Sequence, residues 1–236
     1  MATIVLVGSF VAFGVWWPRP RLDRLAAGRP LVGAGSAWLR GARSVGRAAA
    51  LALYLLCLVC GLAGRNETSD NILPVTLYVV VWVGALVASG AVGDLWGVVN
   101  PIATLSRGAE AVAARVGWKP RQPPPWLGHW PTAVGLGVFL FYELVHPSGA
   151  QPRTLGILLA VHLGLSLVAT VAWGAAWVTG HEPFSALFAW IGAVGPLFGR
   201  DDGGLGLRAP ASGLVGSMQV DTAAFGVIDR KSTRLN

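Results

Sequence analysis

Charged side chains are scarce in this sequence. Asp, Glu, Lys and Arg together make up 12% of the 236 residues, whereas about a quarter of a typical soluble protein is charged. Apolar residues make up 54%, and there are 11 tryptophans. This composition excludes an ordinary soluble domain and predicts an integral membrane protein surrounded by the lipid bilayer.

Cysteine is nearly absent, and the common catalytic motifs are missing. Only Cys57 and Cys60 occur, spaced as C-x-x-C within an apolar run. A thiolate is costly in hydrocarbon and no second pair of ligands is present, so we expect both to be small packing residues. The sequence also contains no G-x-S-x-G, Walker loop, H-E-x-x-H or G-x-G-x-x-G motif, so no standard nucleophile, nucleotide or zinc-protease site is predicted.

Acidic residues are fewer than basic ones, which gives a formal net charge of +7. In a soluble protein such an excess would favour nucleic-acid binding. Here the arginines lie in short segments between apolar runs, which is a pattern of membrane topology. We therefore predict no nucleic-acid partner.

Five apolar segments are long enough, or nearly so, to cross roughly 30 Å of hydrocarbon, which takes about twenty helical residues. They are Ala2–Trp17, Ala48–Gly64, Ile72–Val92, Pro131–His146 and Thr154–Val178, of which the first and fourth are short. Residues 215–228 are a weaker candidate for the start of a sixth span, because Asp221 lies among them. The sequence thus predicts an all-α fold, a polytopic transmembrane helical bundle of about five spans that forms one membrane domain over residues 1–228.

Basic residues alternate between the two sides of this predicted bundle. Thirteen lie in the segments 18–47, 93–130 and 179–214, and two lie in 65–71 and 147–153. The positive-inside rule then places the first group of loops in the cytoplasm and the N-terminus outside. The same orientation is favoured by tryptophans near the predicted cytoplasmic ends of the spans: Trp16, Trp17, Trp96, Trp118, Trp126, Trp130, Trp173 and Trp177.

Two of the predicted loops contain further apolar sequence. In "TLSRGAEAVAARVGW", Ala109, Val112, Ala113 and Val116 fall on one helical face, and Ser106 is a candidate N-cap. This pattern predicts an interfacial helix. The stretch "EPFSALFAWIGAVGPLFG" is bounded by prolines and is predicted to be interfacial or re-entrant.

The last eight residues, Asp229 to Asn236, differ in kind from the rest. One choice of codons for DRKSTRLN spells the start of a common sequencing-library adapter, so we interpret 229–236 as read-through rather than native sequence. A genuine basic tail is the alternative. On the first interpretation, the natural protein continues beyond Ile228 and this chain is a fragment of it.

Few ionisable residues lie within the predicted spans, and each is therefore a candidate for function. Glu143 and His146 stand at i and i+3 near the outer end of the fourth span, and His162 lies inside the outer half of the fifth. Together with Tyr142, Glu143 and His162 are predicted to form a polar pocket that binds a divalent metal or provides a general base for water. The alternative is a purely structural hydrogen bond between Glu143 and His162, with His146 at the water boundary.

A second polar group lies on the predicted cytoplasmic side. It consists of Asp94, Asn100 and Pro101 in "GDLWGVVNP" and of His181 and Glu182 in "TGHEPF". Asp94 directly follows a span and is suited to cap the next helical turn, and Asn-Pro is a common turn dipeptide. We expect these residues to organise loops rather than to take part in catalysis.

The order of four segments resembles one bacterial family. The segments are "WWPRPRLDR", "GDLWGVVNP", "WPTAVGLGVFLFYELVHP" and "FSALFAWIGAVGPL", and the family consists of polytopic membrane proteins known as fenitrothion hydrolases. The likeness covers roughly residues 10–228. It implies a multi-pass protein of the bacterial inner (cytoplasmic) membrane that hydrolyses an organophosphorus triester and releases a nitrophenol. Asp94, Asn100, Pro101 and Glu143 match the family's motifs, whereas the position of His146 is often Tyr in the family.

The first functional hypothesis is a membrane-embedded hydrolase that admits a lipophilic small molecule, with Glu143 and His162 orienting water or a metal ion. Phosphorus chemistry also needs a stabiliser of negative charge, such as a metal or an arginine, and none lies in a predicted span. A transporter or permease is the rival hypothesis, with the same polar residues along its path. A structural subunit of a membrane complex is the third, with small residues such as Gly84, Ala88 and Gly135 at its helix contacts.

Overall fold

The computed structural model describes residues 25–33, 35–214, 220–221 and 226–227. The first predicted span, Ala2–Trp17, and the tail 229–236 lie outside these residues. The described chain is mostly helical, and its elements in chain order are β1 (Arg29–Val32), α3 (Ala37–Ala63), η1 (Thr68–Asp70), α4 (Ile72–Pro74), η2 (Val75–Ala85), α5 (Leu86–Val92), α6 (Leu95–Val99), α7 (Pro101–Arg115), η3 (Pro125–Leu127), α8 (Trp130–Leu144), α9 (Pro152–Trp173), α10 (Ala175–His181), α11 (Pro183–Gly192), β2 (Leu197–Gly199), β3 (Leu205–Leu207), β4 (Val220–Asp221) and β5 (Gly226–Val227).

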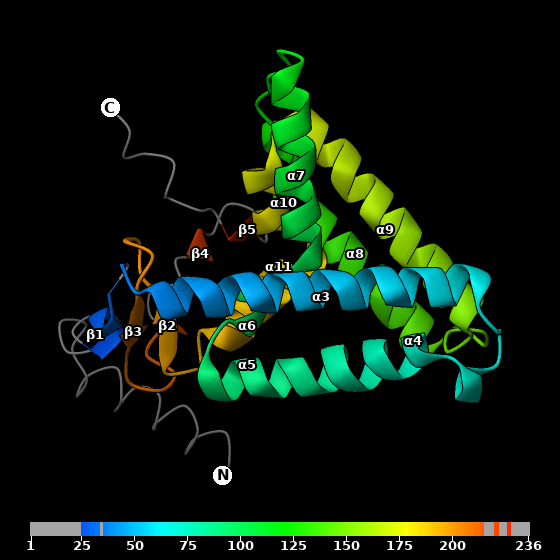
Figure 1. Cartoon of the computed structure of the whole chain (residues 1–236), viewed down its shortest axis with the longest axis horizontal. Coiled ribbons are helices and arrows are strands. Elements are labelled where there is room, and N and C mark those ends of the chain that lie inside the picture. Colours follow the sequence, from blue (N-terminus) through cyan, green and yellow to red (C-terminus); the bar gives the residue numbers. More distant parts are fainter. Residues whose placement is uncertain (1–24, 34, 215–219, 222–225, 228–236) are drawn as a thin grey trace, which may run out of the picture.

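Three helical stretches are long and apolar enough to cross a membrane. They are α3, the continuous helix formed by α4, η2 and α5, and α9. In Figure 1, α3 and the α4–η2–α5 helix have roughly parallel axes and run in opposite directions, whereas α7 runs crosswise to them. The described chain therefore has the helices of a membrane protein, with three candidate spans.

The first of these candidate spans begins earlier than the sequence predicted. α3 starts at Ala37 instead of Ala48, because the Ser36 side chain accepts a hydrogen bond from the backbone N–H of Leu39 and caps the helix. The arginines of this stretch were expected in the loop 18–47. They lie within the helix, and their side chains donate to backbone carbonyls, as Arg47 Nε does to Val98 O at 3.0 Å.

The second candidate span, Ile72–Val92, coincides with the predicted third span. Its central part, η2, is a π-helix of 11 residues, which is a rare conformation that often occurs near functional sites. Two of its aromatic residues join it to the neighbouring segments. The Tyr78 hydroxyl donates to Gly149 O at 2.9 Å, and the Trp82 ring lies 4.8 Å from that of Phe139 in α8.

The predicted fourth and fifth spans are both shorter in the structure. α8 contains 15 residues, or about 22 Å of helix, which is less than the thickness of the hydrocarbon core. α9 ends at Trp173 and not at Val178, because Gly174 has a φ of 91°, a left-handed conformation that glycine adopts readily. The chain reverses at Gly174 and continues as α10.

Helices α3 and α9 pack closely through two glycines. A Cβ placed on Gly156 would lie 2.6 Å from the carbonyl carbon of Gly61, so only hydrogen fits at this crossing. Beside it, Cys57 is buried against Leu73 and Leu155 and forms the main apolar cluster. Cys57 therefore fills space in a helix interface, as expected, and both Cys57 and Cys60 are free thiols.

The N-cap of α7 is not the residue that the sequence predicted. Asn100, rather than the predicted Ser106, caps α7, and Ser106 is fully buried within that helix.

The strands β1, β3 and β2 form a small antiparallel sheet in that order, with Leu207 paired to both Arg29 and Leu197. This sheet, together with β4 and β5, corrects the prediction of an all-α fold. β4 and β5 are the only described parts of residues 215–228, the weaker candidate for the start of a sixth span.

Candidate functional site

Glu182, at the start of α11, is the most deeply buried of the acidic residues that the structure describes. Its side chain is 1% exposed and accepts hydrogen bonds from the backbone N–H groups of Phe184 at 3.1 Å and Ser185 at 2.7 Å. The Ser185 hydroxyl donates to the same carboxylate at 2.7 Å. All of these partners are donors, and they sit at the positive end of a helix, so they stabilise the ionised carboxylate.

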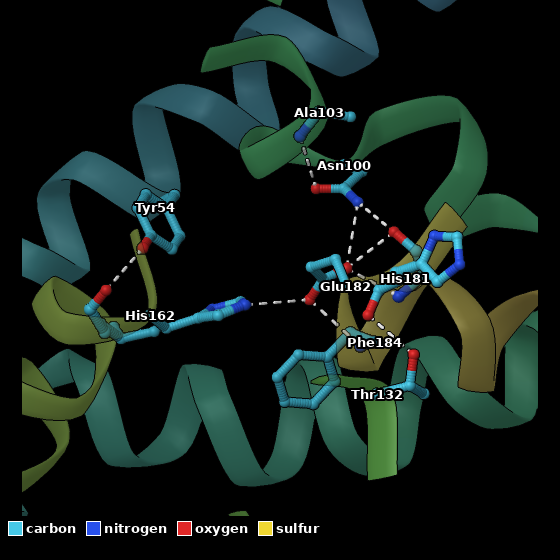
Figure 2. Close-up of polar contacts among 10 residues, drawn as sticks. Tyr54, Asn100, Ala103, Thr132, His162, His181, Glu182 and Phe184 are labelled. Atoms are coloured by element: carbon cyan, nitrogen blue, oxygen red, sulfur yellow. Dashed lines mark hydrogen bonds and ion pairs between the residues drawn. The ribbon is translucent and has the colours of Figure 1, made fainter. Parts of the chain in front are cut away.

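His162 of α9 faces this carboxylate. Its Nε2 atom lies 3.3 Å from Glu182 Oε1, which is an ion-pair distance, although the two atoms are not aligned for a hydrogen bond. The contact depends on the reversal at Gly174, because α10 returns alongside α9 and brings Glu182 back to the depth of His162. Figure 2 shows the imidazole pointing along the dashed contact toward Glu182.

Asn100 joins the same network from α7. Its side-chain oxygen accepts from Ala103 N at 3.1 Å, while its amide donates to Ser185 Oγ at 2.7 Å and to Glu182 Oε2 at 3.4 Å (Figure 2). Pro101 follows as the first residue of α7. Asn100, predicted as part of a turn, therefore caps α7 and also holds the buried carboxylate from a second helix.

An apolar pocket of about 620 Å³ lies next to the His162–Glu182 pair. Its walls come from η2, α8, α9, α10 and the start of α11, and include Phe139, Leu158 and Phe184. Pockets of this size hold drug-sized molecules and are usually apolar with a few well-placed polar groups. The pocket with His162 and Glu182 in its wall is therefore the candidate functional site.

Aromatic rings connect the pocket to the surrounding helices. The Phe184 ring lies 5.1 Å from that of Phe139 and 6.3 Å from the imidazole of His162. His181, one residue before Glu182, stacks on Trp177 at 4.6 Å, and its carbonyl accepts a hydrogen bond from Thr132 at 2.7 Å. These contacts fix the short α10 helix against α8 and so hold Glu182 in place.

The structure places Glu143 and His146 outside this network. Glu143 lies near the C-terminal end of α8 and is partly exposed. His146 packs on Tyr142 with ring centres 4.7 Å apart, and its Nδ1 accepts from Ser148 N at 3.1 Å. His162 is thus brought together with Glu182 and Asn100, which the sequence had assigned to the opposite, cytoplasmic group. The catalytic roles predicted for Glu143 and His162 stay predictions.

A metal site has few ligands here. In the described part of the chain, no three His, Cys, Asp or Glu side chains lie close enough together to hold one ion. His162 and Glu182 offer one imidazole and one carboxylate, which are two of the three or four ligands that a zinc site uses.

Asp94 lies apart from the network, at the N-terminus of α6. Its carboxylate accepts a hydrogen bond from Gly97 N at 2.8 Å and caps the helix, as predicted. Burial raises the pKa of Asp94 above its usual value, while the hydrogen bond from Gly97 acts in the opposite direction. The folded state therefore binds a proton on the Asp94 carboxyl more tightly than the unfolded state does. The resulting gain in the free energy of unfolding is present at low pH and is lost as the pH rises through the raised pKa.

This balance predicts opposite effects for two substitutions of Asp94. Asp94→Asn keeps the acceptor oxygen and removes the cost of burying a charge, so we expect the protein at neutral pH to be at least as stable as the parent. Asp94→Ala removes the cap and is expected to cost about 0.5–2 kcal/mol. Thermal unfolding in detergent at several pH values measures both. An equal loss in the two variants would show that the negative charge itself is needed.

The comparisons with known proteins give no further information on this site. No protein-family model, curated protein or solved structure gives a significant match to the chain.

Sequence reasoning missed the role of Glu182 for a local reason. Glutamate is not among the residues that usually cap helices, and the "HEPF" segment was placed in a loop on the far side of the membrane from His162. A usable signal was present, because Pro183 and Ser185 suit the first turn of a helix whose N-cap is Glu182. The reversal at Gly174 carried no comparable signal.

Proposed function

We propose that this chain belongs to a polytopic membrane protein of about five spans that binds a lipophilic small molecule in the pocket and hydrolyses it. The observation that supports this proposal is the contact between the half-buried His162 and the buried Glu182 in the wall of an otherwise apolar pocket. A buried ionisable pair within a membrane protein is costly, and such pairs usually serve a function. The proposed setting is a bacterial inner membrane, with the N-terminus outside and 18–47 and 93–130 on the cytoplasmic side. The segment 179–214, predicted to be cytoplasmic, begins inside the membrane in this proposal, because Glu182 lies at the depth of His162.

In this proposal His162 acts as the general base. Glu182 stabilises the imidazolium form through Nε2, in the way that a carboxylate orients the base of a catalytic triad. The imidazole takes the proton of a water molecule at Nδ1 as the water oxygen attacks the substrate. Glu182 does not move during this step, because Phe184 N, Ser185 and Asn100 hold it.

The substrate class comes from the family resemblance. For an organophosphorus triester, the water oxygen forms a new bond to phosphorus, the bond between phosphorus and the aryl oxygen breaks, and nitrophenolate leaves. The aliphatic and aromatic walls suit such a neutral, apolar molecule. A divalent metal bound at His162 and Glu182, with a further ligand, would supply the charge stabilisation that the described side chains do not.

The test is the release of nitrophenol from fenitrothion by membranes that contain the protein. We expect release above that of membranes without the protein, and expect His162→Asn to abolish it because the general base is removed. His146→Gln is the matched control, since it also removes an imidazole but lies outside the pocket. Glu143→Gln distinguishes the two candidate sites, and loss of turnover in this variant with retention in His162→Asn would move the site to α8.

Transport of a small molecule is the second candidate function. It is favoured by the break between α9 and α10 at Gly174. After this break the chain runs back along α9 and places the buried Glu182 carboxylate beside His162, in the middle of the α9 span. Discontinuous helices with polar groups at that depth are typical of transporter binding sites. Abundant, folded protein without any nitrophenol release would contradict the hydrolase proposal and favour transport.

A further inference from the structure

The pocket beside His162 is long and narrow. On α9 its lining runs from Leu155 to Trp173, a stretch of helix about 27 Å long. On α8 the lining runs from Pro131 to Tyr142. A cavity of about 620 Å³ that extends this far along two helices must be narrow, so a flexible chain can fill it along its length.

The pocket opens sideways between α8 and α9. Its rim consists of aliphatic residues that line the pocket and are each at least 44% exposed: Val134 and Val138 on α8, and Val161, Leu165 and Val168 on α9. A side chain that both lines a cavity and is largely exposed lies at the edge of an opening. Helix α8 packs mainly against α11, and α9 packs against α3, α7 and α10, so the two sides of the rim do not close over the pocket.

This opening lies at the middle of a candidate span. Helix α9 is long and apolar enough to cross a membrane, and His162 is the eleventh of its 22 residues. The rim residues Val161 and Val168 lie within about 9 Å of His162 along the helix axis. The rim is therefore at the depth of the hydrocarbon core, which is roughly 30 Å thick, and away from both aqueous surfaces.

The chemistry of the lining favours hydrocarbon as the occupant. Among the described residues that line the pocket, none is Lys, Arg or Asp, and the one acidic side chain, Glu182, is already bound by donors of α11. Water finds too few polar partners in such a space. An empty pocket would deprive its wall of dispersion contacts. Lipid tails are as apolar as these side chains, so a tail that enters from the bilayer fills the pocket without burying any charge.

We propose that an acyl chain of a membrane phospholipid enters between α8 and α9 and lies in the pocket against Phe139, Leu158 and Phe184. The inference rests on the same pocket as the proposed function but does not require hydrolysis. A lipophilic small molecule displaces the chain when it binds, and it reaches the pocket from the bilayer by the same route. The ligands of this pocket are therefore molecules that are dissolved in the membrane.

The experiment is photo-crosslinking of the purified full chain in bilayers of phosphatidylcholine that carries a diazirine in the middle of one acyl chain. Mass spectrometry of the labelled peptides then locates the chain. We expect label on residues inside the pocket, namely Phe139, Leu158 and Phe184. Label confined to exposed residues that do not line the pocket, such as Leu144 and Ile157, would overturn the proposal.

Two double variants test the route of entry. Val161→Trp, Val168→Trp places two large rings at the rim and is expected to remove most of the label from the interior of the pocket. Ile157→Trp, Val171→Trp is the matched control, because both residues are exposed on α9 but do not line the pocket, and it should keep the label. An equal loss in both variants would overturn entry between α8 and α9. The map of the unsubstituted protein tests occupancy by itself, whether or not the variants fold.

Labelling and turnover are separate readouts. Label inside the pocket of a protein that releases no nitrophenol would support the lipid site and contradict the hydrolase proposal alone. Turnover by a protein whose pocket takes no label would overturn the lipid site and leave the hydrolase proposal standing.

Discussion

Replacing Glu182 by alanine is expected to lower the free energy of unfolding by about 1–3 kcal/mol or more, the usual cost of leaving buried donors without their acceptor, which is larger for hydrogen bonds to a charged group. The carboxylate accepts from Phe184 N, Ser185 N and the Ser185 hydroxyl, and it faces His162 at 3.3 Å. Without it, the first N–H groups of α11 lose their cap and His162 loses its carboxylate partner. Unfolding of the purified protein in detergent, followed by circular dichroism against denaturant, measures the loss.

Two variants show whether charge or hydrogen bonding carries this effect. Glu182→Gln keeps one acceptor oxygen for the α11 cap but removes the negative charge, so we expect a loss smaller than that of alanine. Glu143→Gln is the matched control, because it makes the same change at a partly exposed position of α8. An Ala variant as stable as the control would contradict the arrangement of the site around a buried ionised carboxylate.

The second large effect is expected at the crossing of α3 and α9. Gly156→Val should lower the free energy of unfolding by about 1–3 kcal/mol or more, the usual cost of overpacking a tight contact. A Cβ at this position would lie 2.6 Å from the carbonyl carbon of Gly61 and 2.9 Å from Leu62 N. These are backbone atoms, so the clash is relieved only if the two helices move apart and the cluster of Cys57, Leu73 and Leu155 opens.

Gly164→Val provides the control for this prediction. It lies in the same helix and undergoes the same change in helix propensity, but nothing lies within 4 Å of a Cβ built at Gly164. The difference between the two variants in thermal or denaturant unfolding therefore isolates the helix contact. Equal stabilities would contradict the close approach of α3 and α9.

The sequence determined the membrane character of this protein and one of its spans. Its scarcity of charge and its long apolar runs predict helices in a bilayer, and the run Ile72–Val92 coincides with the helix α4–η2–α5. The apolar run alone predicts such a helix because backbone groups in hydrocarbon must satisfy one another. The cap at Asp94 was also readable, since a short polar side chain reaches the nearby N–H groups without help from the rest of the fold. The cap of α7 was not, because the sequence predicted Ser106 and the structure has Asn100.

The ends of helices that depend on contacts with distant residues could not be predicted from the sequence. The extension of α3 back to Ala37 places Arg43 and Arg47 in the helix, where carbonyls of Gly203 and Val98 accept their hydrogen bonds. The break at Gly174 lies inside an apolar run without any interruption by charge. Hydropathy measures how apolar a segment is, but a single glycine with positive φ decides where the chain reverses.

Only the tertiary structure decided which polar residues meet. From the sequence, Glu143 was the partner expected for His162, because both lie in the outer half of adjacent predicted spans. The folded chain brings Glu182 to His162 instead, since α10 returns along α9 and α11 begins at the depth of the imidazole. Residue composition fixes how costly it is to bury a charge, whereas the path of the backbone fixes which partner offsets that cost.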